Sequence, residues 1–173
     1  MPSLAEVAAE AAQGEVCEAA NDNAPGQVVV SGHKDAVNRA LDIAKAKGAK
    51  RAVLLPVSAP FHCALMQPAA DAMAKALAEV KMHAPVVPLI ANVTAGPLVS
   101  PDDIRASLIK QVTGTVRWRE CMAAMAASGV NLFVELGAGK VLAGLVKRNA
   151  PEGQGLSIGT PDDISPALPQ LTS

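Results

Sequence analysis

Aromatic residues and an excess of charge of either sign are what this 173-residue sequence lacks most clearly. Aromatic residues make up 2% of the chain, none of them is tyrosine, and the formal net charge is -1. Proteins that bind nucleic acid follow the phosphates with a basic surface, and those that bind single strands also stack the bases on aromatic side chains. The sequence meets neither requirement, so we expect no nucleic-acid partner.

Features typical of membrane, secreted and metal-binding proteins are missing as well. No apolar run approaches the roughly 18 residues that cross a bilayer, and the first residues lack a basic stretch followed by a hydrophobic one. Three widely separated cysteines indicate reduced thiols in a cytoplasmic protein. His33, His62 and His83 lie far apart in the sequence, without HExxH or CxxC spacing, so no metal is expected. The lack of a long apolar run means that no membrane is expected as a partner either.

The sequence does contain enough apolar residues for a core, at 50% hydrophobic and 18% charged. Segments with helical and extended patterns alternate along it, which predicts an α/β fold. Helices are expected at 4–12, after an N-cap at Ser31, around Pro68 in a first turn, and at 101–112, 116–127 and 140–148. Helical spacing predicts that the helix beginning near Pro68 buries Ala69, Met73, Ala76, Leu77 and Val80. Strands are expected at 15–20, 27–30, 51–57, 85–93 and 131–136. A turn at 21–26 would join the first two strands into an antiparallel hairpin.

His62 is the most informative residue, because it follows the expected strand at 51–57 and precedes an amphipathic helix. Ligands and reactive groups gather at the carboxyl ends of strands in open α/β sheets. An imidazole there could act as a general base; alternatively, it could simply donate a hydrogen bond to a loop carbonyl. Cys63 invites a Cys–His pair, but neighbouring side chains usually point apart, so we interpret it as a small buried thiol.

Gly137-Ala138-Gly139-Lys140 follows an expected strand and opens a helix, as phosphate-binding loops do. A Walker loop would need glycine at Val134 and serine or threonine at Val141, and the dinucleotide fingerprint would need a third glycine at Leu142. Both comparisons fail. The segment is therefore interpreted as a tight turn between a strand and a helix.

The segment from Pro56 to Met66 resembles the histidine segment of malonyl-CoA:acyl carrier protein transacylases. Three other segments, 21–32, 111–118 and 134–142, are similar to further landmarks of that family, in the same order and with the same spacing. Together they are specific, whereas any one of them alone would be weak. A small departure is Thr115, where many family members have proline.

The resemblance implies how the chain is organised. Residues 1–57 would form a partial ferredoxin-like small subdomain, and residues 58–150 the C-terminal part of an α/β-hydrolase-like acyltransferase core. Residues 151–173 would be a loosely structured tail.

The resemblance also implies an activity. The family transfers malonyl from malonyl-CoA to the phosphopantetheine thiol of acyl carrier protein in fatty acid biosynthesis, with no cofactor besides the coenzyme A thioester that is its substrate. His62 matches the general base, and Gln111 matches the residue whose backbone carbonyl orients the imidazole. Phe61 matches a substrate-binding position that favours malonyl over branched units by filling space near the acyl C2 atom.

The large departure from the family is the missing nucleophile. No serine of this chain lies in a Gly-x-Ser-x-Gly elbow, and the family's elbow, its oxyanion glutamine and its malonyl-binding arginine are all expected upstream of the matched part. We therefore expect this chain to supply the general-base half of the site.

The alternative to an enzyme is a non-catalytic fragment, or a module that binds the carrier protein without activity of its own. Such a module could use basic side chains against an acidic carrier. The candidates are Lys47, Lys50, Arg51, Arg117 and Arg119.

Overall fold

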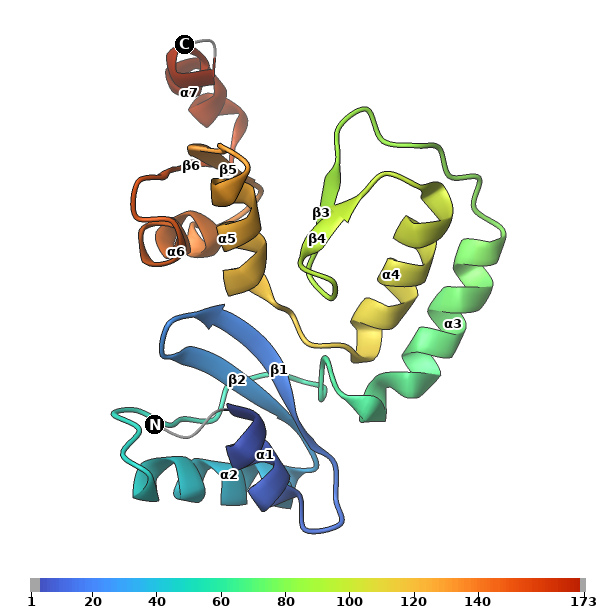
Figure 1. The fold of residues 1–173 in the computed structure, drawn as a ribbon, viewed down its shortest axis with the longest axis vertical. Coiled ribbons are helices and arrows are strands. Elements are labelled where there is room, and N and C mark those ends of the chain that lie inside the picture. The colour runs from blue at the N-terminus through green and yellow to red at the C-terminus, as the bar shows by residue number, and fades with distance from the viewer. Residues whose placement is uncertain (1–3, 172–173) are drawn as a thin grey trace. The chain divides into compact units, whose positions relative to one another are not determined.

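The computed structural model describes residues 4–171, and its contacts divide the chain into two compact units. The first unit ends at Trp118 and the second begins at Arg119. Helices and strands alternate along both units, which confirms the α/β class (Figure 1). The boundary differs from those of the three-part division expected from the sequence, and the ferredoxin-like and hydrolase-like assignments stay predictions.

The first unit begins with two helices and a hairpin. Their bounds are α1 (Leu4–Ala12), β1 (Cys17–Ala24), β2 (Gln27–Gly32) and α2 (Lys34–Ala46). The antiparallel hairpin is confirmed, but residues 21–24 belong to β1 rather than to the turn, since Asn21 and Asp22 pair with valines of β2 and Ala24 pairs with Gln27. Ser31 does not cap α2 because it is itself paired with Glu18 in the hairpin. The helix starts after His33 instead.

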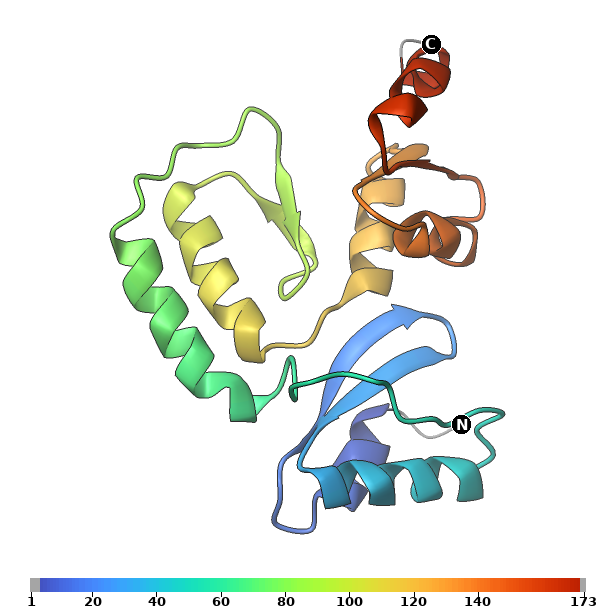
Figure 2. The same ribbon diagram turned by 180° about the vertical axis from the view of Figure 1, so that it is seen from behind.

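Small apolar side chains let α1 and α2 pack closely against the hairpin, an arrangement visible from both sides (Figures 1 and 2). The buried cluster consists of Val7, Ala8, Ala11, Cys17, Ala36 and Ala40. Arg39 of α2 joins the two helices, since its Nε donates to the Ala11 carbonyl at 2.8 Å and its Nη2 to Glu15 at 2.7 Å. Nη2 also donates to the Ala12 carbonyl at 3.0 Å, so Arg39 satisfies two carbonyl groups that the end of α1 leaves without an intrahelical donor.

A second pair of helices completes the first unit. The elements are η1 (Ala64–Met66), α3 (Gln67–Ala78), β3 (Leu89–Ala91), β4 (Gly96–Leu98) and α4 (Pro101–Thr113). Pro68 and Pro101 each lie in the first turn of a helix, as predicted, where the missing N–H costs little. The predicted buried face of α3 is wrong, because Met73 and Val80 are exposed and Ala70 is the buried residue.

The predicted strand at 51–57 is also wrong. These residues are assigned to no strand, and no strand among residues 4–171 pairs with them. Four of their apolar side chains lie largely in solvent: Val53 is 50% exposed, Leu54 58%, Leu55 51% and Val57 61%. The composition favours a strand, but a strand forms only where a neighbour takes its backbone hydrogen bonds.

The second unit is built on a parallel pair of strands. Its elements are α5 (Trp118–Ala127), β5 (Leu132–Leu136), α6 (Val141–Asn149), β6 (Gln154–Ile158), η2 (Pro161–Asp163) and α7 (Ile164–Leu171). The first residue of α5, Trp118, is also the last residue of the first unit. Strand β6 pairs in parallel with β5. The sequence predicts one short strand at 156–158 in an otherwise loose tail; β6 confirms that strand, because β5 supplies it with hydrogen-bond partners. The helices η2 and α7 that follow it are regular structure where none was expected. Within the described residues, no helix has the length and hydropathy to cross a membrane.

The exposed apolar row at 53–57 generates a prediction about self-association. Contiguous exposed apolar residues in an extended segment favour pairing with other chains. We expect the purified chain to show a concentration-dependent mass above 17.6 kDa in light scattering, and Leu54→Lys to lower it. Val80→Lys, at an exposed apolar position outside the row, is the matched control. A monomer at all concentrations, with a sharp and reversible two-state melt, would contradict the prediction.

Candidate active site

His62 lies in the loop that precedes η1, in a backbone conformation that residues with a Cβ seldom adopt. Its φ angle is +59°, in the left-handed region. A residue with a Cβ pays roughly 1 kcal/mol or more for this conformation, so the surrounding contacts have to hold it there. The strain directs attention to what the side chain contacts.

The imidazole of His62 is hydrogen-bonded to the main chain at the end of α4. Its Nδ1 lies 3.0 Å from the carbonyl oxygen of Gln111. A carbonyl oxygen only accepts, so Nδ1 carries the proton and donates it. In the neutral ring, Nε2 is then left as a basic nitrogen that can take a proton. The structure thus brings together the two residues that the sequence comparison paired.

The carbonyl of Gln111 is available because of where α4 ends. The last carbonyls of a helix have no intrahelical donor, and here Gly114 N–H bonds to the Lys110 carbonyl at 2.9 Å, which leaves the next carbonyl to His62. The Gln111 side chain secures this end, since its Nε2 donates to the Gly114 carbonyl at 2.9 Å. A Cβ on Gly114 would lie 2.7 Å from Val93 Cγ2, so the packing here favours glycine.

Cys63 is a structural residue. It is fully buried, and its thiol donates to the Pro60 carbonyl at 3.1 Å. The interpretation as a small buried thiol is therefore confirmed. Cys17, the first residue of β1, is also buried, and burial raises the pKa of its thiol. Neither environment is that of an activated nucleophile, which requires an accessible thiolate.

Phe61 precedes His62, and its side chain is 47% exposed. Its N–H donates to the Ala59 carbonyl at 3.0 Å, so the turn is fixed while the ring remains accessible. The position is compatible with a contact to a bound acyl group, and the substrate-binding role stays a prediction.

The chain leaves α4 and runs alongside β1. Thr115 Oγ1 donates to the Ala19 carbonyl at 2.6 Å, and Val116 N–H donates to the Ala20 carbonyl at 2.8 Å. This pairing explains why α5 starts at Trp118 and not at Val116 as predicted. It also gives the hydroxyl of Thr115 a partner at the position where many family members have proline.

One contact near His62 was missed by sequence reasoning. Glu18 of β1 accepts the N–H of Ala64 with its Oε2 at 3.1 Å. The available signal was a carboxylate among the apolar residues of an expected strand, but residues 18 and 64 are too far apart in sequence for a local pattern to connect them.

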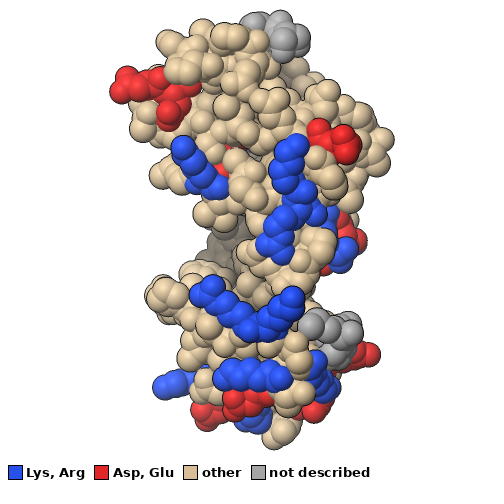
Figure 3. Space-filling view, turned by 90° about the vertical axis from the view of Figure 1, so that its left-hand side faces the viewer, with Lys and Arg blue, Asp and Glu red and all other residues tan. Residues whose placement is uncertain are grey.

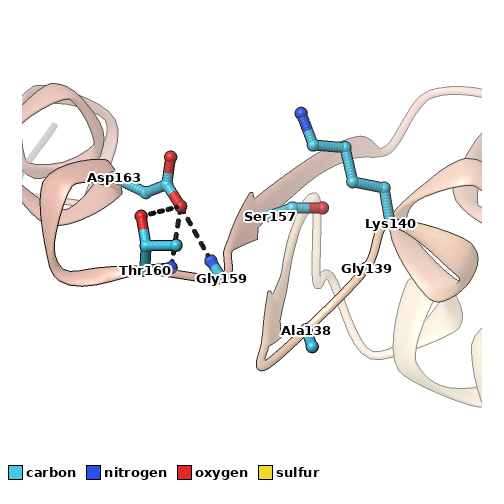
Figure 4. A pocket seen from close by; sticks show the side chains of 7 residues that line it. All are labelled: Ala138, Gly139, Lys140, Ser157, Gly159, Thr160 and Asp163. Carbon is cyan, nitrogen blue, oxygen red and sulfur yellow. Dashed lines mark hydrogen bonds between the residues drawn. The ribbon is translucent and has the colours of Figure 1, made fainter.

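A shallow pocket in the second unit lies where β5 and β6 both end. Its lining consists of Ala138, Gly139, Lys140, Ser157, Gly159, Thr160 and Asp163 (Figure 4). Gly137 and Gly139 have φ angles of 129° and 98°, as the interpretation of this segment as a tight turn requires. Among residues 4–171, no group of three or more His, Cys, Asp or Glu side chains is placed to hold a metal ion.

Asp163 closes the turn at this pocket. One carboxylate oxygen accepts from Gly159 N–H at 3.0 Å, Thr160 N–H at 2.8 Å and Thr160 Oγ1 at 2.9 Å (Figure 4). The hydroxyl of Thr160 and then the backbone N–H groups stabilise the carboxylate form, so the pKa of Asp163 lies below its usual value of 3.8.

Comparison with known proteins shows what the chain is similar to. Residues 3–160 match the family model described as acyl transferase domain. The malonyl CoA-acyl carrier protein transacylase of Escherichia coli strain K12 is 46% identical over 166 residues, covering 96% of this chain and 54% of that protein. The chain therefore spans about half the length of the curated relatives it matches.

Solved structures agree with the sequence comparison. An acyl-carrier-protein S-malonyltransferase from Bartonella henselae superposes with a TM-score of 0.92 at 50% identity, over 98% of this chain and 54% of that one. A malonyl-transacylase in complex with its type II PKS acyl-carrier protein gives 0.92 at 40% identity, over 97% and 54%.

The environment of Asp163 generates a prediction about pH. Because its folded pKa is lowered, the carboxylate stabilises the turn above the unfolded pKa, and this contribution is lost as the pH falls through the folded pKa. The amide shifts of Gly159 and Thr160 should titrate in NMR spectra with a midpoint below 3.8. Asp163→Asn should abolish this titration, and the control Asp162→Asn should preserve it. A midpoint at or above 3.8 would contradict the assignment.

Proposed function

The chain belongs to the acyl transferase domain family, and we propose that it supplies the general-base half of a site that transfers malonyl from coenzyme A to acyl carrier protein. His62 is the base, Gln111 orients it through its backbone carbonyl, and Phe61 borders the acyl group. The single observation that carries the proposal is the hydrogen bond from His62 Nδ1 to Gln111 O at 3.0 Å.

The mechanism assigned to His62 needs a hydroxyl nucleophile from the part of the fold that the relatives contain and this chain does not span. His62 Nε2 takes the hydroxyl proton as the oxygen attacks the thioester carbonyl. The carbon–sulfur bond then breaks, and the ring returns the proton to the coenzyme A thiolate. In the second half, Nε2 takes the proton of the carrier's phosphopantetheine thiol, and the resulting thiolate attacks the malonyl ester. The carbon–oxygen bond of the ester then breaks, and the ring returns the proton to the released oxygen, which restores the hydroxyl.

The contact with Gln111 supports this role in two ways. It fixes the tautomer in which Nε2 is free, and it places a carbonyl oxygen beside the ring when the ring becomes positive. The carbonyl belongs to the carboxyl end of α4, where the helix dipole is negative. This arrangement follows the logic of a catalytic triad, with a backbone carbonyl in place of the third side chain.

The proposed reaction uses the coenzyme A thioester as a substrate and calls for no separate cofactor or metal. Its setting is fatty acid biosynthesis in the cytoplasm. The names of the curated relatives and the family match support the reaction class.

The proposal predicts the effect of removing the imidazole. A chimera joining this chain to the preceding segment of the Escherichia coli transacylase should transfer labelled malonyl from coenzyme A to acyl carrier protein. His62→Ala should lower kcat/KM by roughly 10²–10⁴, the usual contribution of a positioned general base. His83→Ala, at an exposed histidine, should leave the rate unchanged.

An active chimera that retains its rate after His62→Ala would contradict the proposal. The 173-residue chain alone provides a further check, because incubation with labelled malonyl-CoA should leave no serine ester on it. A stable ester would show that the chain carries its own nucleophile.

A carrier-binding module without activity is the second candidate, and the charge on the α1–α2 part of the first unit favours it. Lys and Arg side chains lie side by side on one face there, with Asp and Glu side chains directly beside them (Figure 3). Lys50 and Arg51 are exposed and follow α2. Two of the cations expected from the sequence are already engaged, since Lys47 pairs with Glu10 and Arg117 donates to the Thr94 carbonyl at 3.0 Å.

Charge reversal tests the binding surface. Lys50→Glu with Arg51→Glu should weaken binding of an acidic acyl carrier protein several-fold in calorimetry at low salt, and the difference should shrink as salt rises. Lys75→Glu with Lys81→Glu, two exposed lysines on and just after α3, is the control of equal charge change. Unchanged affinity in the double variant would exclude this face from carrier docking.

A further inference from the structure

The helix that follows His62 begins without a cap from its own N-cap residue. Cys63 occupies that position in an extended conformation, with φ -143° and ψ 173°, and makes no side-chain cap. Its thiol is directed instead to the Pro60 carbonyl. The first N–H groups of η1 and α3 therefore need an acceptor from elsewhere in the chain.

Glu18 supplies that acceptor from β1. Its Oε2 takes the N–H of Ala64, the first residue of η1, at 3.1 Å. A carboxylate at this end also faces the positive end of the helix dipole. Ala64 is two residues from His62, so the cap adjoins the residue whose φ of +59° has to be held by its surroundings.

The loop around His62 is otherwise bonded mainly to itself. Phe61 N–H reaches the Ala59 carbonyl, and Met66 N–H reaches the Cys63 carbonyl. The bonds to Glu18 and Gln111 connect the loop to β1 and α4. The Glu18 bond fixes the backbone and the Gln111 bond fixes the ring.

The same strand also binds the segment that follows Gln111, the partner of the imidazole. Ala19 O accepts the hydroxyl of Thr115, and Ala20 O accepts the N–H of Val116, just beyond the end of α4. Glu18 and Ala19 are paired with β2 in the hairpin, and Ala20 is 2% exposed. Three consecutive residues of one paired strand thus bind both segments that carry the His62–Gln111 contact.

We propose that Glu18 is a positioning residue for His62, and that residues 18–20 of β1 are the common support that sets the imidazole against the Gln111 carbonyl. The inference rests on the proposed function only in taking His62 to be the base. The geometric claim concerns the ring and its tautomer, and it can be tested without any acyl transfer.

The test is NMR of the full chain labelled with ¹⁵N-histidine, supplemented by hydrogen exchange at the Ala64 amide. In the wild type, His62 should be the Nδ1–H tautomer with a protected ring proton. Glu18→Ala should raise exchange at Ala64 about fivefold or more and shift His62 toward the mixed tautomers of a free imidazole. Glu18→Gln keeps an oxygen acceptor and should restore most of the wild-type tautomer and protection.

Glu79→Ala, at an exposed glutamate at the end of α3, is the control and should leave both readouts unchanged. A wild-type tautomer ratio and Ala64 protection in Glu18→Ala would overturn the proposal. If Glu18→Ala does not fold, Glu18→Met, which keeps the length of the side chain and lacks the carboxylate, decides: loss of Nδ1–H protection supports the role, and retained protection contradicts it. Failure of the His62→Ala activity test would reject the proposed function and leave this result standing.

Discussion

A hydrogen bond between a side chain and the end of a helix is the constraint on which the site of this protein depends. The imidazole of His62 donates to the Gln111 carbonyl, which the end of α4 leaves unused. An isolated neutral imidazole exchanges between two tautomers, and this contact selects one of them. The identity of the free nitrogen thus follows from where a helix stops.

The hydrogen bond between His62 and Gln111 has to offset the free energy that the backbone conformation of His62 costs. His62 adopts a positive φ, and such conformations persist where neighbouring structure over-determines them. Here the buried Cys63 thiol bonds within the loop, and the Glu18 carboxylate and the Gln111 carbonyl hold the loop from β1 and α4. Strain concentrated at one residue, with support from separate elements, is typical of a functional position.

Local signals in the sequence predicted the parts of the fold that depend on local chemistry. The hairpin, α1, and the start of α4 at Pro101 were confirmed, because turn residues, helical periodicity and helix-start signals act over a few positions. The turn proved shorter than predicted and Ser31 caps no helix, since pairing between β1 and β2 extends through both. The strand at 51–57 and the buried face of α3 were wrong, since both depend on which neighbour the segment meets. Resemblance paired His62 with Gln111, whereas the contact from Glu18 to Ala64 joins residues that no local pattern relates.

The acceptor at position 111 belongs to the main chain, and this affects how the site can change. No point substitution deletes a backbone carbonyl, so the partner of the imidazole survives replacement of the Gln111 side chain as long as the helix ends at the same residue. Substitutions can therefore remove this hydrogen bond from the acceptor side only if they move the end of α4. Gly114 is one such position, because a Cβ there would collide with Val93. Substitution of Gly114 should therefore disturb proton transfer by His62 more than substitution of the Gln111 side chain, although Gln111 makes the contact.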